Sequence, residues 1–166
     1  MCIRDRAKAM AGPAKDIDAT SPDLSRFAAR GGKLLMYHGW NDPAISPQNS
    51  IHYFSSVRQA LGADKADGML RLYLAPGMEH CLGGPGPSYF GQLGLPAAGG
   101  PGTGALDLLE KWVEDGKAPD AILAAAQPSS PKATPTVRPL CPYPARAVYD
   151  GKGDAKQPGS FACKVD

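Results

Sequence analysis

Two residues of this sequence, Asp42 and His80, have the side chains needed for proton-transfer chemistry, and each follows a short apolar run. A carboxylate beside an imidazole fixes the tautomer of the ring. It also stabilises the imidazolium that forms when a serine hydroxyl is deprotonated. Taken singly, both residues have ordinary explanations, because Asp before Pro often forms a turn and a lone loop histidine is often a surface residue. The pair therefore indicates chemistry only if the fold brings the two loops together.

The elements around this pair alternate as in an α/β sheet. The apolar runs 33–38 and 69–74 are predicted to be buried strands, and a helix is predicted over 47–61 between them, capped by Ser46. Functional loops in such sheets lie beyond the carboxyl ends of the strands. If the two strands are parallel neighbours, the loops that follow them converge at one edge.

The order of the two residues is that of a hydrolase triad, in which the nucleophile comes first, then the acid, then the histidine. The acid and the histidine are present here, but the sequence has no G-x-S-x-G elbow. Ser88 follows a Gly-Pro loop without such an elbow and is rejected as a nucleophile. The nucleophile is expected upstream of this chain.

A second helix is predicted further along, and Gly116 ends it. Its apolar stripe is expected to comprise Leu106, Leu109 and Val113, joined by Leu108 and Trp112. Residues 122–124 are predicted to be a short edge strand. The segment beyond is rich in proline and is predicted to be an arm.

Composition excludes several classes of function. The 166 residues carry a formal net charge of +2, from 18 basic and 16 acidic side chains, without a basic cluster, so nucleic-acid binding is not expected. No apolar run approaches the roughly 18 residues that a membrane span needs. The 20 glycines and 17 prolines indicate extensive loops.

The cysteines indicate a disulfide rather than a zinc site, because none of the four forms a C-x-x-C pair. Cys141 and Cys163 enclose a Pro/Gly-rich tail that could not bury much core, and a bond between them would staple it. The alternative is two unpaired thiols in a loose tail. A disulfide would imply an oxidising compartment.

The chain is divided by composition into four parts. Residues 1–6 have no apolar core of a signal peptide and are expected to be an artefactual leader, so Cys2 is set aside. Residues 7–30 are expected to be an approach segment, 31–127 the catalytic part, and 128–166 the C-terminal arm.

Four segments resemble the tannase and feruloyl esterase family. The segment 31–54 contains G-W-x-D-P and resembles the stretch that bears the acid; 71–90 contains P-G-M-x-H-C and resembles the histidine stretch. The segments 106–124 and 138–154 resemble the following helix and the C-terminal tail. The resemblance implies the C-terminal part of an α/β-hydrolase sheet with a Pro/Gly-rich, disulfide-stapled tail.

The resemblance also implies roles for single residues. Asp42 would be the triad acid and His80 the base. Cys81 matches a cysteine that bonds to one beside the nucleophile in the family; that partner is missing here, so Cys81 is expected to be a free thiol. Trp40 could line the substrate pocket or simply pack.

The parts that the family has upstream are absent from this sequence: the serine, most of the oxyanion hole, and a calcium-binding lid, from which 7–30 would be the exit. No cofactor or metal is therefore expected in this chain. The implied function is hydrolysis of small aromatic-acid esters by a secreted or periplasmic serine esterase, with this chain inactive alone. The oligomeric state stays open.

Two other interpretations remain from the residues. The chain could be an accessory or binding fragment without chemistry. A metal site built on His38, Asp42 and His80 is possible from residue types, although the spacing is not that of a dense ligand set. His38 itself is expected to be packed or hydrogen-bonded at the end of its strand.

Overall fold

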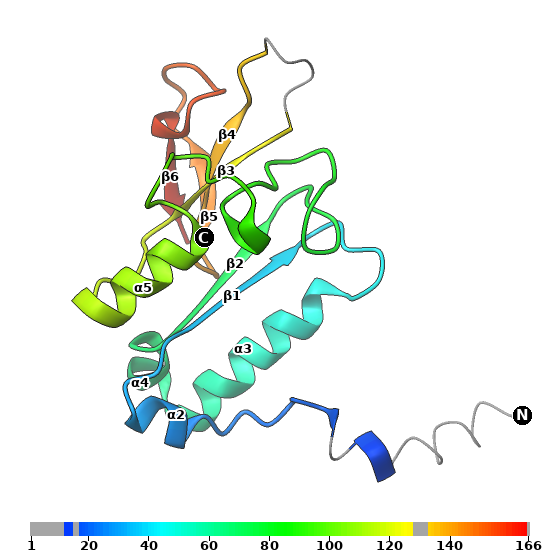
Figure 1. Cartoon of the computed structure of the whole chain (residues 1–166), viewed down its shortest axis with the longest axis vertical. Coiled ribbons are helices and arrows are strands. Elements are labelled where there is room, and N and C mark those ends of the chain that lie inside the picture. Colours follow the sequence, from blue (N-terminus) through cyan, green and yellow to red (C-terminus); the bar gives the residue numbers. More distant parts are fainter. Residues whose placement is uncertain (1–11, 15–16, 128–132, 166) are drawn as a thin grey trace, which may run out of the picture.

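The computed structural model describes residues 12–14, 17–127 and 133–165. The segment 1–6, expected to be a leader, lies outside them. The elements run in the order α2 (Ser25–Ala29), β1 (Leu34–Gly39), α3 (Pro47–Leu61), α4 (Ala63–Asp67), β2 (Leu70–Ala75), η1 (Gln92–Gly94), α5 (Ala105–Asp115), β3 (Ile122–Ala125), β4 (Val137–Leu140), β5 (Arg146–Tyr149), η2 (Pro158–Ser160) and β6 (Phe161–Lys164) (Figure 1).

The strands β1 and β2 form a parallel pair at the centre of the molecule, in register from Leu34 opposite Leu70 to Gly39 opposite Ala75. Both predicted strands are confirmed, each one residue further along the chain. Side chains alternate between the two faces of the pair, as a strand requires. Leu34 and Met36 pack with the core under α3, whereas Leu35 and Tyr37 pack with the core on the other face.

Helix α3 covers one face of this pair and confirms the predicted helix. Ser46 is its N-cap and accepts a hydrogen bond from the Gln48 N–H at 3.3 Å. Gly62 ends it with a φ of +83°, a value that a residue with a Cβ rarely adopts. Its side chains Phe54 and Val57 are buried against the strands. The helix therefore lies between the two strands in the chain and excludes water from the face of the strand pair that it covers.

Helix α5 covers the other face with only part of its predicted apolar stripe. Trp112 is only 2% exposed, whereas Leu106 is 63% and Val113 59% exposed. Of the predicted apolar residues, Trp112 is therefore buried and Leu108 packs against the core, whereas Leu106 and Val113 lie on the exposed side. The helix is apolar on two sides, and the side that bears Trp112 faces inward. Lys33 Nζ and Arg71 Cζ lie over the Trp112 ring, 5.4 and 5.3 Å from its centroid.

The C-terminal arm contains regular structure that its composition did not predict. The predicted edge strand appears as β3 and pairs with β4 in antiparallel fashion, while β5 pairs with β6. The predicted disulfide between Cys141 and Cys163 is present, with the Cα atoms 5.5 Å apart, and it ties β6 to the end of β4. Glycine and proline did not prevent this because the strands are short and antiparallel.

The arm also covers the outer edge of β2. The Tyr143 N–H donates to the Leu72 carbonyl at 2.7 Å, and Tyr73 forms an isolated bridge with Pro142. In the described ranges, no strand pairs with the outer edge of β1. One edge of the central pair is therefore closed by the chain itself and the other is open.

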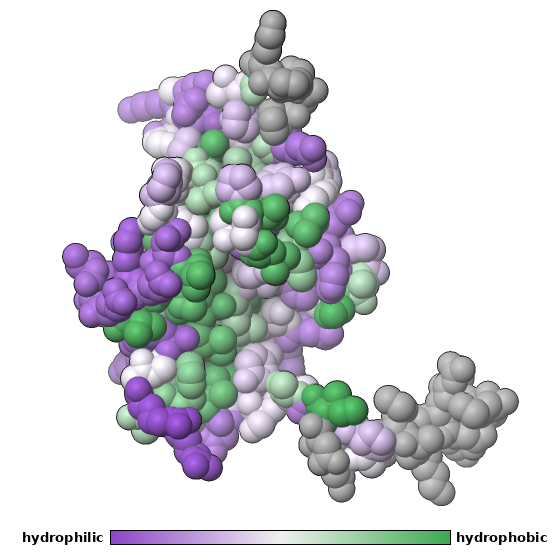
Figure 2. Space-filling view, in the orientation of Figure 1, coloured by the Kyte–Doolittle hydropathy of each residue, from purple (hydrophilic) through white to green (hydrophobic). Residues whose placement is uncertain are grey.

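Apolar side chains gather beside the open edge. A shallow hollow of about 370 Å³ is lined there by Leu35, Tyr37, Leu93, Leu106 and Leu109, among others; these five residues are called the open apolar face below. Figure 2 shows apolar surface over β1, η1 and the adjoining side of α5. Within the described residues, no helix is long and apolar enough to cross a membrane.

Candidate active site

The loops after β1 and β2 are joined to each other by their backbones. The Trp40 N–H donates to the Ala75 carbonyl and the Asn41 N–H to the Met78 carbonyl, both at 3.0 Å. Gly39 makes this approach possible, because a Cβ there would collide with the backbone carbonyl oxygens of Met78 and Glu79. The convergence expected from two parallel strands is therefore present, and it depends on a glycine.

The Asp42 side chain lies in the first of these loops and is only 3% exposed. Its Oδ1 accepts hydrogen bonds from the Ala44 and Ile45 N–H groups at 2.8 and 2.9 Å. Its Oδ2 lies 2.7 Å from His80 Nδ1, so the predicted contact between the two residues is confirmed as geometry. The turn that Asp before proline favours and the contact with the histidine exist together.

The charged form of Asp42 is stabilised by these contacts. Burial alone would raise its pKa, but the hydrogen bonds from the Ile45 N–H, the His80 ring and the Ala44 N–H, with the charge of His80, outweigh burial. The pKa of the carboxyl therefore lies well below its ordinary value of 3.8. At neutral pH Asp42 is a carboxylate that can only accept hydrogen bonds.

Nε2 of His80 is the ring nitrogen that does not contact Asp42. Because the Asp42 carboxylate only accepts, Nδ1 of His80 carries a proton, and Nε2 of the neutral ring has a free lone pair. The His80 side chain is 52% exposed, and none of the described residues hydrogen-bonds to its Nε2. Such a nitrogen can take a proton from a hydroxyl placed beside it.

The side chain of Gln92 hydrogen-bonds to the backbone of the loop that carries His80. Nothing in the sequence indicated this residue. The buried Gln92 amide accepts from the Phe90 N–H at 2.9 Å and donates to the carbonyls of Ser88 at 2.5 Å and Cys81 at 3.3 Å. A single glutamine in a glycine-rich stretch has no periodic pattern that would single it out. Its contacts connect the residue after His80 to the chain entering η1.

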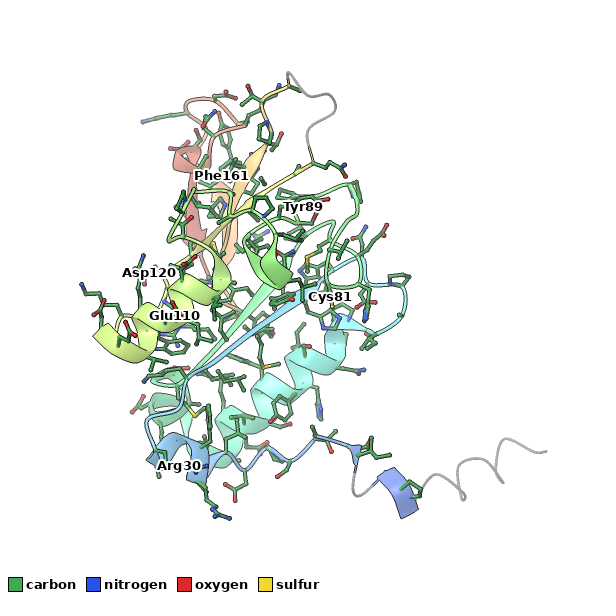
Figure 3. All side chains as sticks on the ribbon, viewed as in Figure 1. Arg30, Cys81, Tyr89, Glu110, Asp120 and Phe161 are labelled. Carbon is green, nitrogen blue, oxygen red and sulfur yellow. A yellow bond between two sulfur atoms is a disulfide. The ribbon has the colours of Figure 1, made fainter. Side chains whose placement is uncertain are left out.

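Cys81 directly follows His80 and has a φ of +67°. It is a free cysteine and partly exposed, as expected for this chain. Figure 3 places its side chain at the strand ends, in the loop that follows β2. The thiol is therefore next to the candidate base.

His38, at the end of β1, contacts the acid as well. Its Nε2 lies 3.2 Å from Asp42 Oδ2 and 3.0 Å from the Ile45 carbonyl, and its Nδ1 lies 2.7 Å from Ser50 Oγ. The sequence predicted a packed or hydrogen-bonded residue, and the hydrogen bonds to Ser50 and Ile45 confirm this. It did not predict that the ring would also lie 3.2 Å from Asp42. Across the described ranges no group of three or more His, Cys, Asp or Glu could hold a metal ion, and both imidazoles direct a nitrogen at the carboxylate instead.

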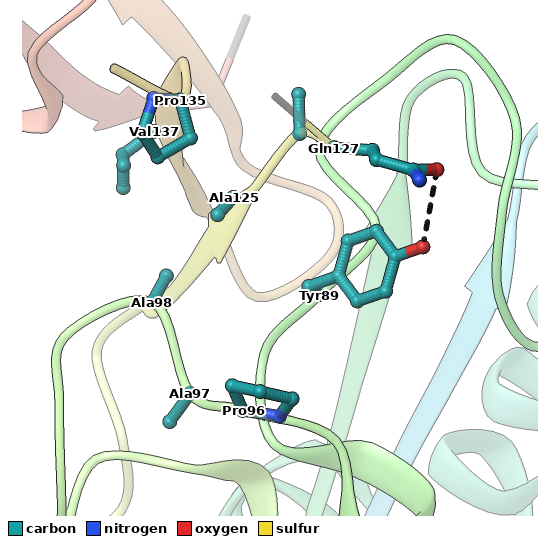
Figure 4. A pocket seen from close by; sticks show the side chains of 9 residues that line it. Tyr89, Pro96, Ala97, Ala98, Ala125, Gln127, Pro135 and Val137 are labelled. Atoms are coloured by element: carbon teal, nitrogen blue, oxygen red, sulfur yellow. Dashed lines mark hydrogen bonds between the residues drawn. The ribbon is translucent and has the colours of Figure 1, made fainter. Parts of the chain in front are cut away.

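Trp40 is partly exposed and lines a hollow of about 460 Å³ between β2 and residues 139–147. A second hollow of about 440 Å³ has mostly proline and alanine walls and a hydrogen bond of 3.4 Å from Tyr89 to Gln127 at its rim (Figure 4). Neither hollow is lined by Asp42 or His80. The role of Trp40 as a substrate-pocket residue stays a prediction.

Comparison with known proteins places this arrangement in a family. The family model described as tannase and feruloyl esterase matches residues 3–164. The chain belongs to the tannase and feruloyl esterase family. The match includes both loops of the candidate site and the arm with its disulfide.

Individual members of the tannase and feruloyl esterase family agree with this. The chain is 43% identical to an uncharacterized esterase of Xanthomonas campestris pv. campestris, over 96% of this chain and 31% of that protein. It is 41% identical to the mono(2-hydroxyethyl) terephthalate hydrolase of Piscinibacter sakaiensis, over 87% of this chain and 22% of the relative. The crystal structure of feruloyl esterase B from Aspergillus oryzae superposes with a TM-score of 0.83 at 33% identity, over 99% of this chain and 33% of that one. The chain thus spans a third or less of the length of these relatives.

Proposed function

We propose that this chain supplies the acid and the base of a serine carboxylic ester hydrolase, as the C-terminal part of an α/β-hydrolase sheet. The observation that carries the proposal is the 2.7 Å contact between the buried Asp42 carboxylate and Nδ1 of the exposed His80. Family membership supports ester hydrolysis, and the contact supports a triad mechanism. We propose no cofactor for this chain, since the resemblance to the family implies calcium only in a lid that this sequence does not contain.

The proposed reaction runs through an acyl-enzyme. Nε2 of His80 takes the proton of a serine hydroxyl while the serine oxygen attacks the ester carbonyl carbon, and Asp42 stabilises the imidazolium that forms. His80 then gives this proton to the departing alcohol oxygen. In the second half, His80 takes a proton from water, the hydroxide attacks the acyl carbon, and the proton returns to the serine.

The nucleophile of this reaction belongs to the longer protein. Ser46 caps α3, Ser50 contacts His38 and the Ser88 hydroxyl is buried without a partner. None of these serines, in the described residues, contacts Nε2 of His80. The chain alone is therefore proposed to be inactive.

Substrate and compartment are proposed on separate grounds. Two relatives are a terephthalate monoester hydrolase and a feruloyl esterase, so we assign small esters of aromatic acids as the substrate class. The disulfide between Cys141 and Cys163 supports export to an oxidising compartment, because such bonds are rare in reducing ones. The Cys141–Cys163 bond of the C-terminal arm would then form only after export.

The experiment expresses the coding region with its upstream sequence, called the full-length protein below, and compares it with the isolated chain on an aryl ester. The full-length protein is expected to hydrolyse the ester and the isolated chain is not. His80→Ala should reduce kcat by roughly 10⁶-fold, and His52→Ala, an exposed histidine of α3, should leave it unchanged. Full activity of His80→Ala would reject the proposed base, and turnover by the isolated chain would require a nucleophile within it.

A further inference from the structure

We infer that His38 is a positioning residue for the acid, holding the Asp42 carboxylate in the orientation that His80 requires. This inference rests on the proposed function, since it concerns the same acid and base. The observation behind it is that two imidazoles meet at one oxygen: Asp42 Oδ2 lies 2.7 Å from His80 Nδ1 and 3.2 Å from His38 Nε2.

The tautomer of His38 follows from its neighbours. Nε2 hydrogen-bonds to the Ile45 carbonyl at 3.0 Å, and Asp42 Oδ2 lies 3.2 Å from the same nitrogen. Because both oxygens can only accept, Nε2 carries a proton. Nδ1 faces the Ser50 hydroxyl at 2.7 Å, which can donate to its lone pair. Ser50 on α3 therefore fixes the ring in the form that presents an N–H to Asp42.

These contacts hold the His38 ring beside the carboxylate and attach both to the same loop. The Ile45 N–H donates to Asp42 Oδ1, while the Ile45 carbonyl accepts from the same His38 nitrogen that reaches Oδ2. The backbone N–H groups fix Oδ1 only, and a carboxylate held at one oxygen can still rotate about its terminal bond, because such torsions are broad. The positive end of the His38 N–H dipole, with Nε2 at 3.2 Å from Oδ2, attracts that oxygen and so opposes the rotation.

His38 cannot act as a second base, because its side chain is only 11% exposed and both nitrogens are engaged. Its contribution is expected in the orientation of His80, not in substrate binding. Small misplacements of catalytic groups reduce turnover by as much as about 10²-fold. A residue acting in this way lowers kcat and leaves KM unchanged.

The test compares the full-length protein, His80→Ala and four further variants on an aryl ester, with the melting temperature measured for each. His38→Leu removes the N–H, and we expect kcat to fall roughly 10- to 100-fold with unchanged KM. His38→Gln can place an amide N–H near the position of Nε2, and it should recover most of the loss. Ser50→Ala removes the hydroxyl that fixes the tautomer and should cause a smaller fall in kcat. His52→Leu, on the same helix, is the matched control and should match the wild type.

The outcomes separate the inference from the proposed function. If His80→Ala stays active, the proposed function fails. If His80→Ala is inactive while His38→Leu keeps the wild-type kcat, only the inference fails. If kcat falls equally in His38→Leu and His38→Gln, and in proportion to the fall in melting temperature, the ring acts by packing alone. That result would overturn the inference. Should His38→Leu not fold, Ser50→Ala decides: wild-type kcat in that variant also overturns it.

Discussion

Two regions of the molecule differ in how complete they are. At the strand ends, around Gly39, Asp42 and His80, backbone and side-chain groups of the described residues satisfy both oxygens of the buried carboxylate. On the open apolar face, Leu93 and Leu106 stay 68% and 63% exposed beside an unpaired strand edge. Asp42 and His80 are therefore held by nearby segments of the chain, whereas among the described residues no strand pairs with the outer edge of β1 in the sheet that precedes them.

The difference indicates which region depends on further protein. Large exposed apolar residues grouped beside a strand edge are typical of a surface that another segment covers. The geometry of Asp42 and His80, by contrast, rests on contacts with neighbouring described residues of the two loops, β1, α3 and η1. Variants in the two regions should therefore behave differently, and four predictions test this.

The largest effect is expected from Asp42→Asn in the full-length protein. An amide can present an N–H to His80 and favours the wrong tautomer, so kcat should fall roughly 10⁴-fold. Leu106→Ala is the matched change on the open apolar face and should preserve the chemistry of bound substrate. Steady-state kinetics on an aryl ester measure both, and comparable losses of kcat in the two variants would remove the distinction between the regions.

The next effect concerns the two sides of α5. Trp112→Ala empties a buried site and should lower the free energy of unfolding by about 3–5 kcal/mol. Leu106→Ala in the purified chain should change it by about 0.5 kcal/mol or less, because its side chain is mostly exposed. Urea unfolding followed by far-UV circular dichroism measures both. A large loss from Leu106→Ala would mean that the face is already covered in the isolated chain.

A smaller effect is expected from Gly39→Ala. Its Cβ would meet backbone carbonyl oxygens of the neighbouring loop, which cannot rotate away like a side chain, so overpacking should cost about 1–3 kcal/mol of stability. Gly159→Ala is the control, because its Cβ would have no neighbour within 4 Å. Chemical denaturation compares them, and equal stability of the two variants would show that the loops can separate freely.

The smallest effect concerns acid. Because the pKa of Asp42 is lowered from 3.8, the folded chain binds this proton less readily than the unfolded chain. The contribution of Asp42 is fully present above about pH 4 and is lost as the pH falls through the lowered folded-state pKa. The urea midpoint of Asp42→Asn should therefore change less with pH below about 4 than that of the wild type. Parallel pH profiles would contradict the stabilised carboxylate.

The sequence predicted the parts of the fold that have local signals. Ser46 and Gly62 delimit α3, and the apolar runs before Asp42 and His80 locate the two strands within one residue. Of the apolar residues predicted for α5, Trp112 is buried while Leu106 and Val113 are exposed, because a helix with apolar residues on two sides does not reveal which side has a partner. That choice depends on β2 and the arm, far away in the chain.

The candidate site was predictable to a similar extent. The acid and the histidine follow from their places after parallel strands, and the catalytic roles remain predictions. Gln92 and the contact of His38 with Asp42 were not foreseen, because both depend on the path of loops. The strands β4 to β6 were missed because proline and glycine dominate the composition around them.

The edge of β2 closed by residues 142–143 has a consequence for association between copies of the chain. A two-stranded sheet with a single unpaired edge can accept one further strand and then offers no second edge for growth. If two chains paired through β1 in this way, the pairing would end with two copies, and this sheet could not serve as a template for a fibril. The tyrosine and proline contacts of the arm with β2 would thus limit pairing through this one sheet to a closed dimer.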